Sequence, residues 1–132
     1  MAFLIGITLA VAVGVSGTIL GLDRDKAFYP TIMVVIASYY ALFAVMGESP
    51  RALIIESIVI VAFLGASIAG FKLSAWFVAA ALAAHGVFDF IHGRLIVNPG
   101  VPAWWPQFCL AYDVTAAVYL AWLLSRRKGR AT

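Results

Sequence analysis

Five ionisable side chains lie inside apolar stretches of this sequence. His85, Asp89 and His92 share one stretch, Glu56 lies in the stretch before it, and Asp113 lies in the stretch after it. Because His85, Asp89 and His92 are spaced i, i+4 and i+7, a helix would carry all three on one face. Imidazole and carboxylate ligands suit zinc, iron, manganese or copper, and helical bundles bind such metals with inward-facing residues. The sequence therefore predicts a divalent transition metal held by these five residues.

The same residues would also support acid–base chemistry without a metal. Carboxylates clustered in a low-dielectric interior cannot all ionise, so Glu56, Asp89 and Asp113 are candidate catalytic groups. Membrane-embedded isomerases and cyclases of isoprenoid or sterol substrates could use such groups, with aromatic side chains stabilising a carbocation by cation–π attraction. The candidate aromatic wall is Tyr39, Tyr40, Trp104, Trp105 and Tyr112. A structural interpretation stays open, in which the ionisable side chains only hydrogen-bond one another and fix the helix register.

The elements that carry these residues are predicted to cross a membrane. Of the 132 residues, 64% are hydrophobic and 11% are charged, whereas soluble domains are about half apolar and about a quarter charged. A bilayer core about 30 Å thick needs roughly 20 apolar residues per helix. Cutting the chain at charges, prolines and turn residues leaves five spans, at about 2–22, 27–46, 52–70, 75–92 and 107–124. The prediction is an all-α, single-domain bundle of five helices over residues 1–132, multi-pass in the cell membrane, such as a bacterial inner membrane.

The distribution of lysine and arginine predicts the orientation of the bundle. If the carboxyl terminus is cytoplasmic, seven of the nine basic residues are cytoplasmic and only Arg51 and Arg94 face outward. Positive charge is retained on the cytoplasmic side, so the amino terminus is predicted outside and the carboxyl terminus inside. With alternating helix directions, the five ionisable residues all fall in the outer half of the bilayer, within roughly 10 Å of its outer interface. This common depth favours one shared site.

Small residues and charge distribution limit the partners. Gly6, Ala10, Gly14 and Thr18 recur every four residues in the first span, which lets another helix approach closely. Packing within the chain is the favoured use of this stripe, and a homo-oligomer is the alternative. The basic residues lie in short loops and the tail rather than on one folded surface, so no nucleic acid is expected. The expected partners are membrane lipids and a hydrophobic small-molecule substrate.

Two motifs carry a family resemblance. The stretch His85-Gly-Val-Phe-Asp89-Phe-Ile-His92 is followed by Asn98-Pro99 and then by Cys109-Leu-Ala-Tyr-Asp113. This last third of the chain resembles an uncharacterised family of small bacterial integral membrane proteins with an H-x3-D-x2-H motif, a G/N-P loop and a C-x3-D motif in the last two helices. The resemblance implies that the motif residues act as a set, and it implies no activity. The chain departs from the family pattern in having a single histidine at position 92 and a longer loop rich in proline and tryptophan.

These observations predict an integral membrane protein with a His/carboxylate site inside the bilayer. The favoured function is a metal-binding or acid–base enzyme that acts on a lipid-like or isoprenoid substrate. One alternative is a transport or storage protein that handles metal ions or protons. Transport needs polar groups on both sides of the midplane, and the inner half offers few, which disfavours it. Another alternative is a non-catalytic subunit of a larger membrane complex.

Overall fold

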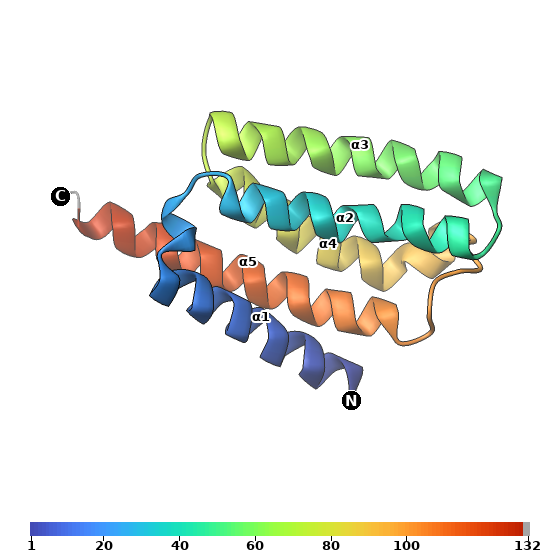
Figure 1. Ribbon diagram of the computed structural model, residues 1–132, viewed down its shortest axis with the longest axis horizontal. Coiled ribbons are helices and arrows are strands. Elements are labelled where there is room, and N and C mark those ends of the chain that lie inside the picture. Colours follow the sequence, from blue (N-terminus) through green and yellow to red (C-terminus); the bar gives the residue numbers. More distant parts are fainter. Residues whose placement is uncertain (131–132) are drawn as a thin grey trace.

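The computed structural model of the protein describes residues 1–130 as five long α-helices and one short 3-10 helix (Figure 1). The elements are α1 (Ala2–Leu20), η1 (Leu22–Arg24), α2 (Phe28–Met46), α3 (Pro50–Lys72), α4 (Trp76–Leu95) and α5 (Trp105–Arg130). No strand occurs among these described residues. Each of the five α-helices is long and apolar enough to cross a membrane. The predicted all-α bundle of five membrane-spanning helices is confirmed.

Local signals explain where the helices begin and end, and they move several predicted boundaries. Helix α1 ends at Leu20 because Gly21 adopts the left-handed conformation, with φ of 75°, which glycine reaches without steric cost. Helix α3 begins at Pro50, two residues before the predicted start, because the Ser49 hydroxyl accepts a hydrogen bond from the Ala52 amide. Helix α5 continues past its apolar part to Arg130. Three of its basic residues, Arg127, Lys128 and Arg130, lie in the last turn, where cations interact favourably with the helix dipole.

The helices run alternately up and down, so the bundle has two distinct ends (Figure 1). We call them the N-terminal end, where α1, α3 and α5 begin and the 96–104 loop lies, and the basic end, where α5 finishes. Helix α1 packs on α5, α4 packs on α5 and α3, and α2 packs mainly on α3. Helices α1 and α2, whose residues are all described, make no close backbone contact with each other. The bundle is therefore open between these two helices.

The stripe of small residues on α1 is used within the chain. A Cβ atom added at Gly6 would collide with the backbone carbonyl of Phe108 on α5. One added at Gly14 would lie 2.9 Å from the ring of Tyr119, also on α5. Packing within the chain, the favoured interpretation of this stripe, is what the structure shows, and the homo-oligomer stays a prediction.

Candidate metal centre

The five ionisable residues predicted to form a site are all buried inside the bundle. Glu56, Asp89 and Asp113 are 0% exposed, His85 is 1% exposed and His92 is 2% exposed. They come from the first part of α3, the second half of α4 and the first part of α5. All of them therefore lie toward the N-terminal end of the bundle, at the common depth that the sequence predicts.

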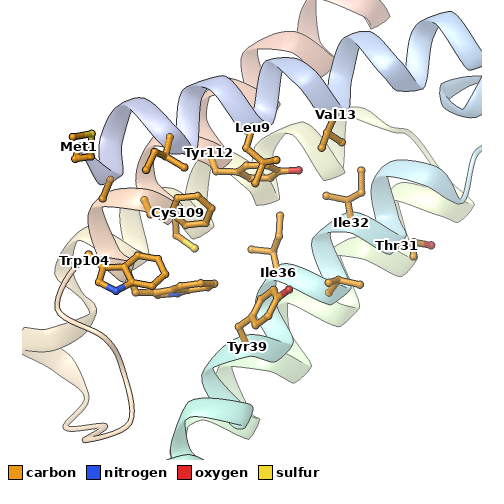
Figure 2. A pocket seen from close by; sticks show the side chains of 15 residues that line it. Met1, Leu9, Val13, Thr31, Ile32, Ile36, Tyr39, Trp104, Cys109 and Tyr112 are labelled. Carbon is orange, nitrogen blue, oxygen red and sulfur yellow. The ribbon is translucent and has the colours of Figure 1, made fainter.

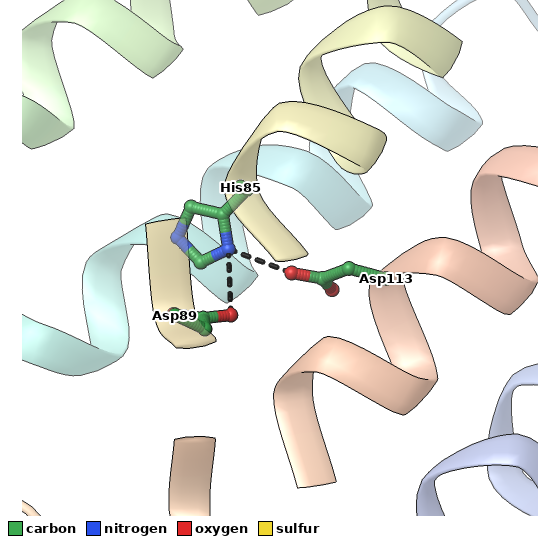
Figure 3. A group of neighbouring side chains, drawn as sticks. All are labelled: His85, Asp89 and Asp113. Atoms are coloured by element: carbon green, nitrogen blue, oxygen red, sulfur yellow. Dashed lines mark hydrogen bonds and ion pairs between the residues drawn. The ribbon is translucent and has the colours of Figure 1, made fainter. Parts of the chain in front are cut away.

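Three of the five residues form one compact group, His85, Asp89 and Asp113 (Figure 3). Each offers one ligand atom, and these atoms all lie within 4.8 Å of one another. Nδ1 of His85 lies 2.7 Å from Oδ2 of Asp113 and 3.2 Å from Oδ2 of Asp89. One imidazole nitrogen and two carboxylates around a common point are donors that a divalent transition metal accepts. We call these three residues the His–Asp group.

Helix geometry and one glycine bring the His–Asp group together. His85 and Asp89 lie one turn apart on α4 and therefore project from the same face. Asp113 approaches them from α5, and Gly86 makes this approach possible. A Cβ atom at position 86 would lie 3.2 Å from Cβ of Asp113 and 3.2 Å from a methyl group of Val114. These distances are tighter than most Cβ contacts, so any larger residue would require Asp113 and Val114 to shift.

Glu56 and His92 form a separate pair and do not join the His–Asp group. Nε2 of His92 lies 2.6 Å from Oε1 of Glu56. His92 is seven residues after His85, and at 1.5 Å per residue this displaces it by about 10 Å along the helix axis. Among the described residues, the ligand atoms that lie within 4.8 Å of one another belong to His85, Asp89 and Asp113, and neither Glu56 nor His92 is part of that group. The predicted site of five ligands is therefore divided into a group of three and a pair.

Tyr40 of α2 links the His–Asp group to the pair. Its hydroxyl group donates a hydrogen bond of 2.5 Å to Oδ1 of Asp89. Its ring stacks on the imidazole of His92, with ring centroids 4.0 Å apart and an angle of 15° between the planes. The sequence placed Tyr40 in an aromatic wall, whereas the structure places it in the polar network itself.

Asn98, in the 96–104 loop, completes the pair. Its side-chain amide donates hydrogen bonds to Oε1 of Glu56, at 2.9 Å, and to the backbone carbonyl of Tyr40, at 3.1 Å. Gly100 lies against the end of α2 so closely that a Cβ atom there would collide with the carbonyl of Phe43. The loop is thus fastened over the polar residues by an asparagine and a glycine. Both lie in the loop rich in proline and tryptophan that follows the H-x3-D-x2-H motif.

The buried charges of this region are unbalanced. The three carboxylates of Glu56, Asp89 and Asp113 have only histidines as ion-pair partners among the described residues. If all three carboxylates were ionised, one negative charge would remain in an apolar interior even with both imidazoles protonated, which is costly. One oxygen of each carboxylate is also buried without a hydrogen-bond partner: Oε2 of Glu56, Oδ2 of Asp89 and Oδ1 of Asp113. A bound cation or an additional proton would supply the missing charge.

An apolar pocket of about 880 Å³ lies between α1, α2 and α5, close to this region (Figure 2). Four of the five aromatic residues predicted as a wall line it, namely Tyr39, Trp104, Trp105 and Tyr112. Cys109 also lines the pocket, and it belongs to the same buried cluster as Tyr40. Because Cys109 lies one turn before Asp113 on α5, the pocket and the His–Asp group share this stretch of helix.

No family model, curated protein or solved structure matches this chain. The resemblance to a family of small bacterial membrane proteins therefore stays a prediction. The structure brings the residues of its two motifs into one region, where His85, Asp89 and Asp113 form the group of three and His92 stacks on Tyr40.

Gly86 is a site residue that the sequence did not single out, and the sequence did not predict that Tyr40 and Asn98 join the polar network. Helical spacing identifies residues on one face but does not say which neighbouring helix or loop lies opposite that face. A glycine directly after His85 was a usable signal, since small residues mark close helix contacts in membranes. The asparagine of the Asn98-Pro99 dipeptide gave no signal for a partner 42 residues away in the chain.

Proposed function

We propose that this protein binds a divalent transition metal, such as zinc, iron, manganese or copper, through His85, Asp89 and Asp113. The observation that carries the proposal is the convergence of their ligand atoms to within 4.8 Å of one another in a buried site. The unbalanced negative charge described above supports it, because a cation would offset the cost of burying these carboxylates. Three protein ligands would leave coordination positions free for water or substrate, as in catalytic metal sites.

We further propose that the protein is an enzyme acting on a lipid-like or isoprenoid substrate. The apolar pocket beside the His–Asp group supports this, since ligand sites are mostly apolar cavities with a few placed polar groups. A metal in such a site would polarise a substrate oxygen or activate a water molecule. Tyr40 would act as a positioning residue, because its hydroxyl group holds Oδ1 of Asp89 while Oδ2 faces Nδ1 of His85 at the centre of the group.

Acid–base catalysis without a metal is the second candidate. The hydrogen bond of 2.7 Å between Nδ1 of His85 and Oδ2 of Asp113 supports it. A carboxylate in this position orients an imidazole and stabilises its protonated form, as general bases require. Under this alternative, His85 would accept or donate the proton, and the site would take the same class of substrate.

A transport pathway has less support. Between the polar network and the basic end, the interior is filled by a tightly packed apolar cluster that includes Met33, Val78 and Leu82, each 0% exposed. A metal ion or proton crossing the bundle would have to pass through this cluster, whose buried members offer no polar side chains other than those of Tyr29 and Tyr112, and such a passage is costly. This apolar cluster therefore favours a site that is reached from one side of the membrane.

Elemental analysis of tag-free purified protein tests the metal proposal. We expect about one metal ion per chain in the wild type, and loss of this metal in His85→Gln and Asp113→Asn. His92→Gln is the matched control, since it also replaces a buried histidine of α4 but one outside the His–Asp group, and it should retain the metal. A folded wild-type protein without metal, after purification in metal-supplemented medium, would overturn the metal proposal and favour acid–base chemistry. Equal metal loss in all three variants would contradict the assignment of the ligands.

A further inference from the structure

A second pocket lies at the basic end of the bundle, away from the polar network. It has a volume of about 180 Å³ and is lined by residues 23–26 between α1 and α2, by the start of α2, by residues 70–75 around the turn between α3 and α4, and by the last part of α5. These segments meet at the end of the bundle where α5 finishes (Figure 1). We call this cavity the basic-end pocket.

The charged side chains that line the basic-end pocket are mostly cationic. They are four cations, Arg24, Lys26, Lys72 and Arg127, and two carboxylates, Asp23 and Asp25. Both carboxylates already have partners, because Asp23 binds Thr18 and Arg127, and Asp25 accepts a hydrogen bond of 2.8 Å from the backbone amide of Ala27. Arg24, Lys26 and Lys72 are exposed and form no ion pair among residues 1–130. The pocket therefore has cations available to an anion.

Arg127 is held at the pocket by one of its nitrogen atoms. Nη2 donates a hydrogen bond of 2.9 Å to the backbone carbonyl of Asp23 and lies 3.3 Å from Oδ1 of the same residue. A guanidinium group has five N–H donors in a planar fork that suits phosphate oxygens. Those on Nε and Nη1 make no hydrogen bond within the described part of the chain. Arg127 thus keeps its structural contact with Asp23 and still has donors for an anion.

The size and the walls of the pocket favour a phosphate that is attached to a lipid. A water molecule takes about 30 Å³ in the liquid, so the cavity has room for about six waters, which suits a headgroup phosphate rather than an acyl chain. Phe71 and Leu73 line the pocket and are 43% and 75% exposed. They lie at the end of α3, a helix that can cross the membrane. Hydrocarbon attached to a phosphate in the pocket would therefore contact apolar side chains.

The convergence of cations on one cavity is more specific than the charge of the basic end as a whole. Retention of positive charge on the cytoplasmic side explains why seven of the nine basic residues lie at this end. It does not require any of them to share a cavity, and Arg126, Lys128 and Arg130 do not line the pocket. If the basic end is cytoplasmic, as the sequence predicts, it meets the leaflet that carries anionic lipids, and basic pockets between membrane helices bind phosphate headgroups there.

We propose that the basic-end pocket binds the phosphate group of an anionic phospholipid. Arg127, Lys26 and Lys72 contact the phosphate oxygens, and the acyl chains lie on the apolar surface beside Phe71 and Leu73. This site is separate from the His–Asp group, and lipid binding there does not depend on the proposed function.

Thermal unfolding of the purified protein in neutral detergent micelles tests this proposal, because a ligand that binds the folded state stabilises it in proportion to its concentration and affinity. The probes are phosphatidylglycerol and phosphatidylcholine with the same acyl chains, titrated at the same ionic strength. For the wild type we expect stabilisation by phosphatidylglycerol at lower concentration than by phosphatidylcholine, whose choline cation would face the lysines. In Lys26→Gln/Lys72→Gln the apparent affinity for phosphatidylglycerol should fall about 30-fold, or about fivefold for each cation lost.

A matched double variant on α5 distinguishes the pocket from general attraction to the basic tail. Arg126→Gln/Lys128→Gln removes the same charge at the same end of the bundle, but neither residue lines the pocket. The affinity for phosphatidylglycerol should change by less than about twofold, since exposed charges in the tail are screened by salt. Equal losses in the two double variants would overturn the proposal. So would equal affinity of the wild type for the two lipids.

Inorganic phosphate distinguishes a lipid site from a site for the free anion. We expect millimolar sodium phosphate to stabilise the wild type no more than sodium chloride of the same ionic strength. Stabilisation by phosphate as strong as that by phosphatidylglycerol, and lost in Lys26→Gln/Lys72→Gln, would overturn the assignment to a lipid. Asp113→Asn should bind phosphatidylglycerol as the wild type does, because Asp113 does not line this pocket. Loss of lipid binding in this variant, with the fold intact, would contradict two separate sites.

Discussion

At the basic end of the bundle, a buried carboxylate has a full cation beside it, whereas at the N-terminal end two carboxylates share one imidazole. The side chain of Asp23 is 4% exposed, and it accepts a hydrogen bond from Thr18 and pairs with Arg127 at 3.3 Å. The Arg127 side chain is 49% exposed, so water also reaches this pair. Asp89 and Asp113 have only His85 as a charged partner among the described residues, and all three lie out of reach of solvent.

This difference separates a structural polar network from a candidate functional one. The interaction at the basic end joins η1 to α5 and leaves no uncompensated charge. The network at the N-terminal end leaves carboxylate oxygens without hydrogen-bond partners, and it has more carboxylates than imidazoles. Ionisable residues inside a membrane are costly and are usually functional. Among residues 1–130, the buried carboxylates without a fully charged cation beside them lie at one end of the bundle, near the apolar pocket.

Replacing His85 should have the largest effect on stability. His85→Ala leaves Asp89 and Asp113 buried without an imidazole, and breaking a buried ion pair costs about 3–5 kcal/mol. Unfolding of the purified protein in mixed detergent micelles measures this cost. The control is Val87→Ala on the same helix, at a position that is 57% exposed, where a change within about 0.5 kcal/mol is expected. Equal costs for the two variants would contradict the importance of the buried histidine.

Separating α4 from α5 should be nearly as damaging. Gly86→Val adds atoms where even a Cβ would lie 3.2 Å from Asp113 and Val114, and overpacking of this kind costs about 1–3 kcal/mol. The same change moves Asp113 away from His85, so the metal content should also fall. Gly65→Val on α3 is the control, because nothing lies within 4 Å of a Cβ atom at that position. A Gly86→Val protein with normal stability and metal content would show that the close approach of the two helices is not required.

Removing the hydroxyl group of Tyr40 should have an intermediate effect. Tyr40→Phe keeps the ring stacked on His92 but leaves Oδ1 of Asp89 without its donor, at a cost of about 1–3 kcal/mol. If Asp89 binds the metal, affinity for zinc should fall about 10–100-fold, as for other residues that position metal ligands. Competition with a chromogenic chelator measures the affinity. Tyr39→Phe, at a residue that is 37% exposed at the pocket, should leave zinc affinity unchanged, and a similar loss there would argue against a specific role of Tyr40.

The smallest effect is expected at the basic end. Arg127→Gln removes the cation of a partly exposed pair, and such pairs contribute at most about 1 kcal/mol. Thr18 continues to donate its hydrogen bond to Asp23. Metal content should not change, because this pair lies at the opposite end of the bundle from the His–Asp group. Measuring stability and metal content of Arg127→Gln beside His85→Ala tests the contrast between the two ends, and metal loss in Arg127→Gln would break it.

The architecture could be predicted well from the sequence, because the number and positions of membrane helices depend on only a few physical constraints. Apolar length and interrupting charges identify membrane helices, so all five were found, with errors confined to their ends. At those ends, local hydrogen bonding decides the boundary, as the Ser49 cap of α3 does. The common depth of the ionisable residues also follows from helix length and direction alone.

The division of the site could not be predicted in the same way. His85, Asp89 and His92 do share one buried face of α4, as their spacing predicts. Which of them contacts which carboxylate depends on how far α3 and α5 are shifted relative to α4 along the bundle axis. No local pattern in the sequence encodes that shift. Tyr40 and Asn98 join the network from α2 and the 96–104 loop, through long-range contacts that only the folded chain defines.

X-ray absorption spectroscopy of the zinc-loaded, tag-free protein tests the central claim most directly. If His85, Asp89 and Asp113 bind the ion, the first coordination shell should contain only nitrogen and oxygen atoms at about 2.0–2.2 Å, with the scattering signature of a single imidazole. This spectrum should disappear in Asp113→Asn and persist in His92→Gln. A shell with a sulfur ligand, with two or more imidazoles, or unchanged in Asp113→Asn would contradict the claim that these three residues form a metal centre.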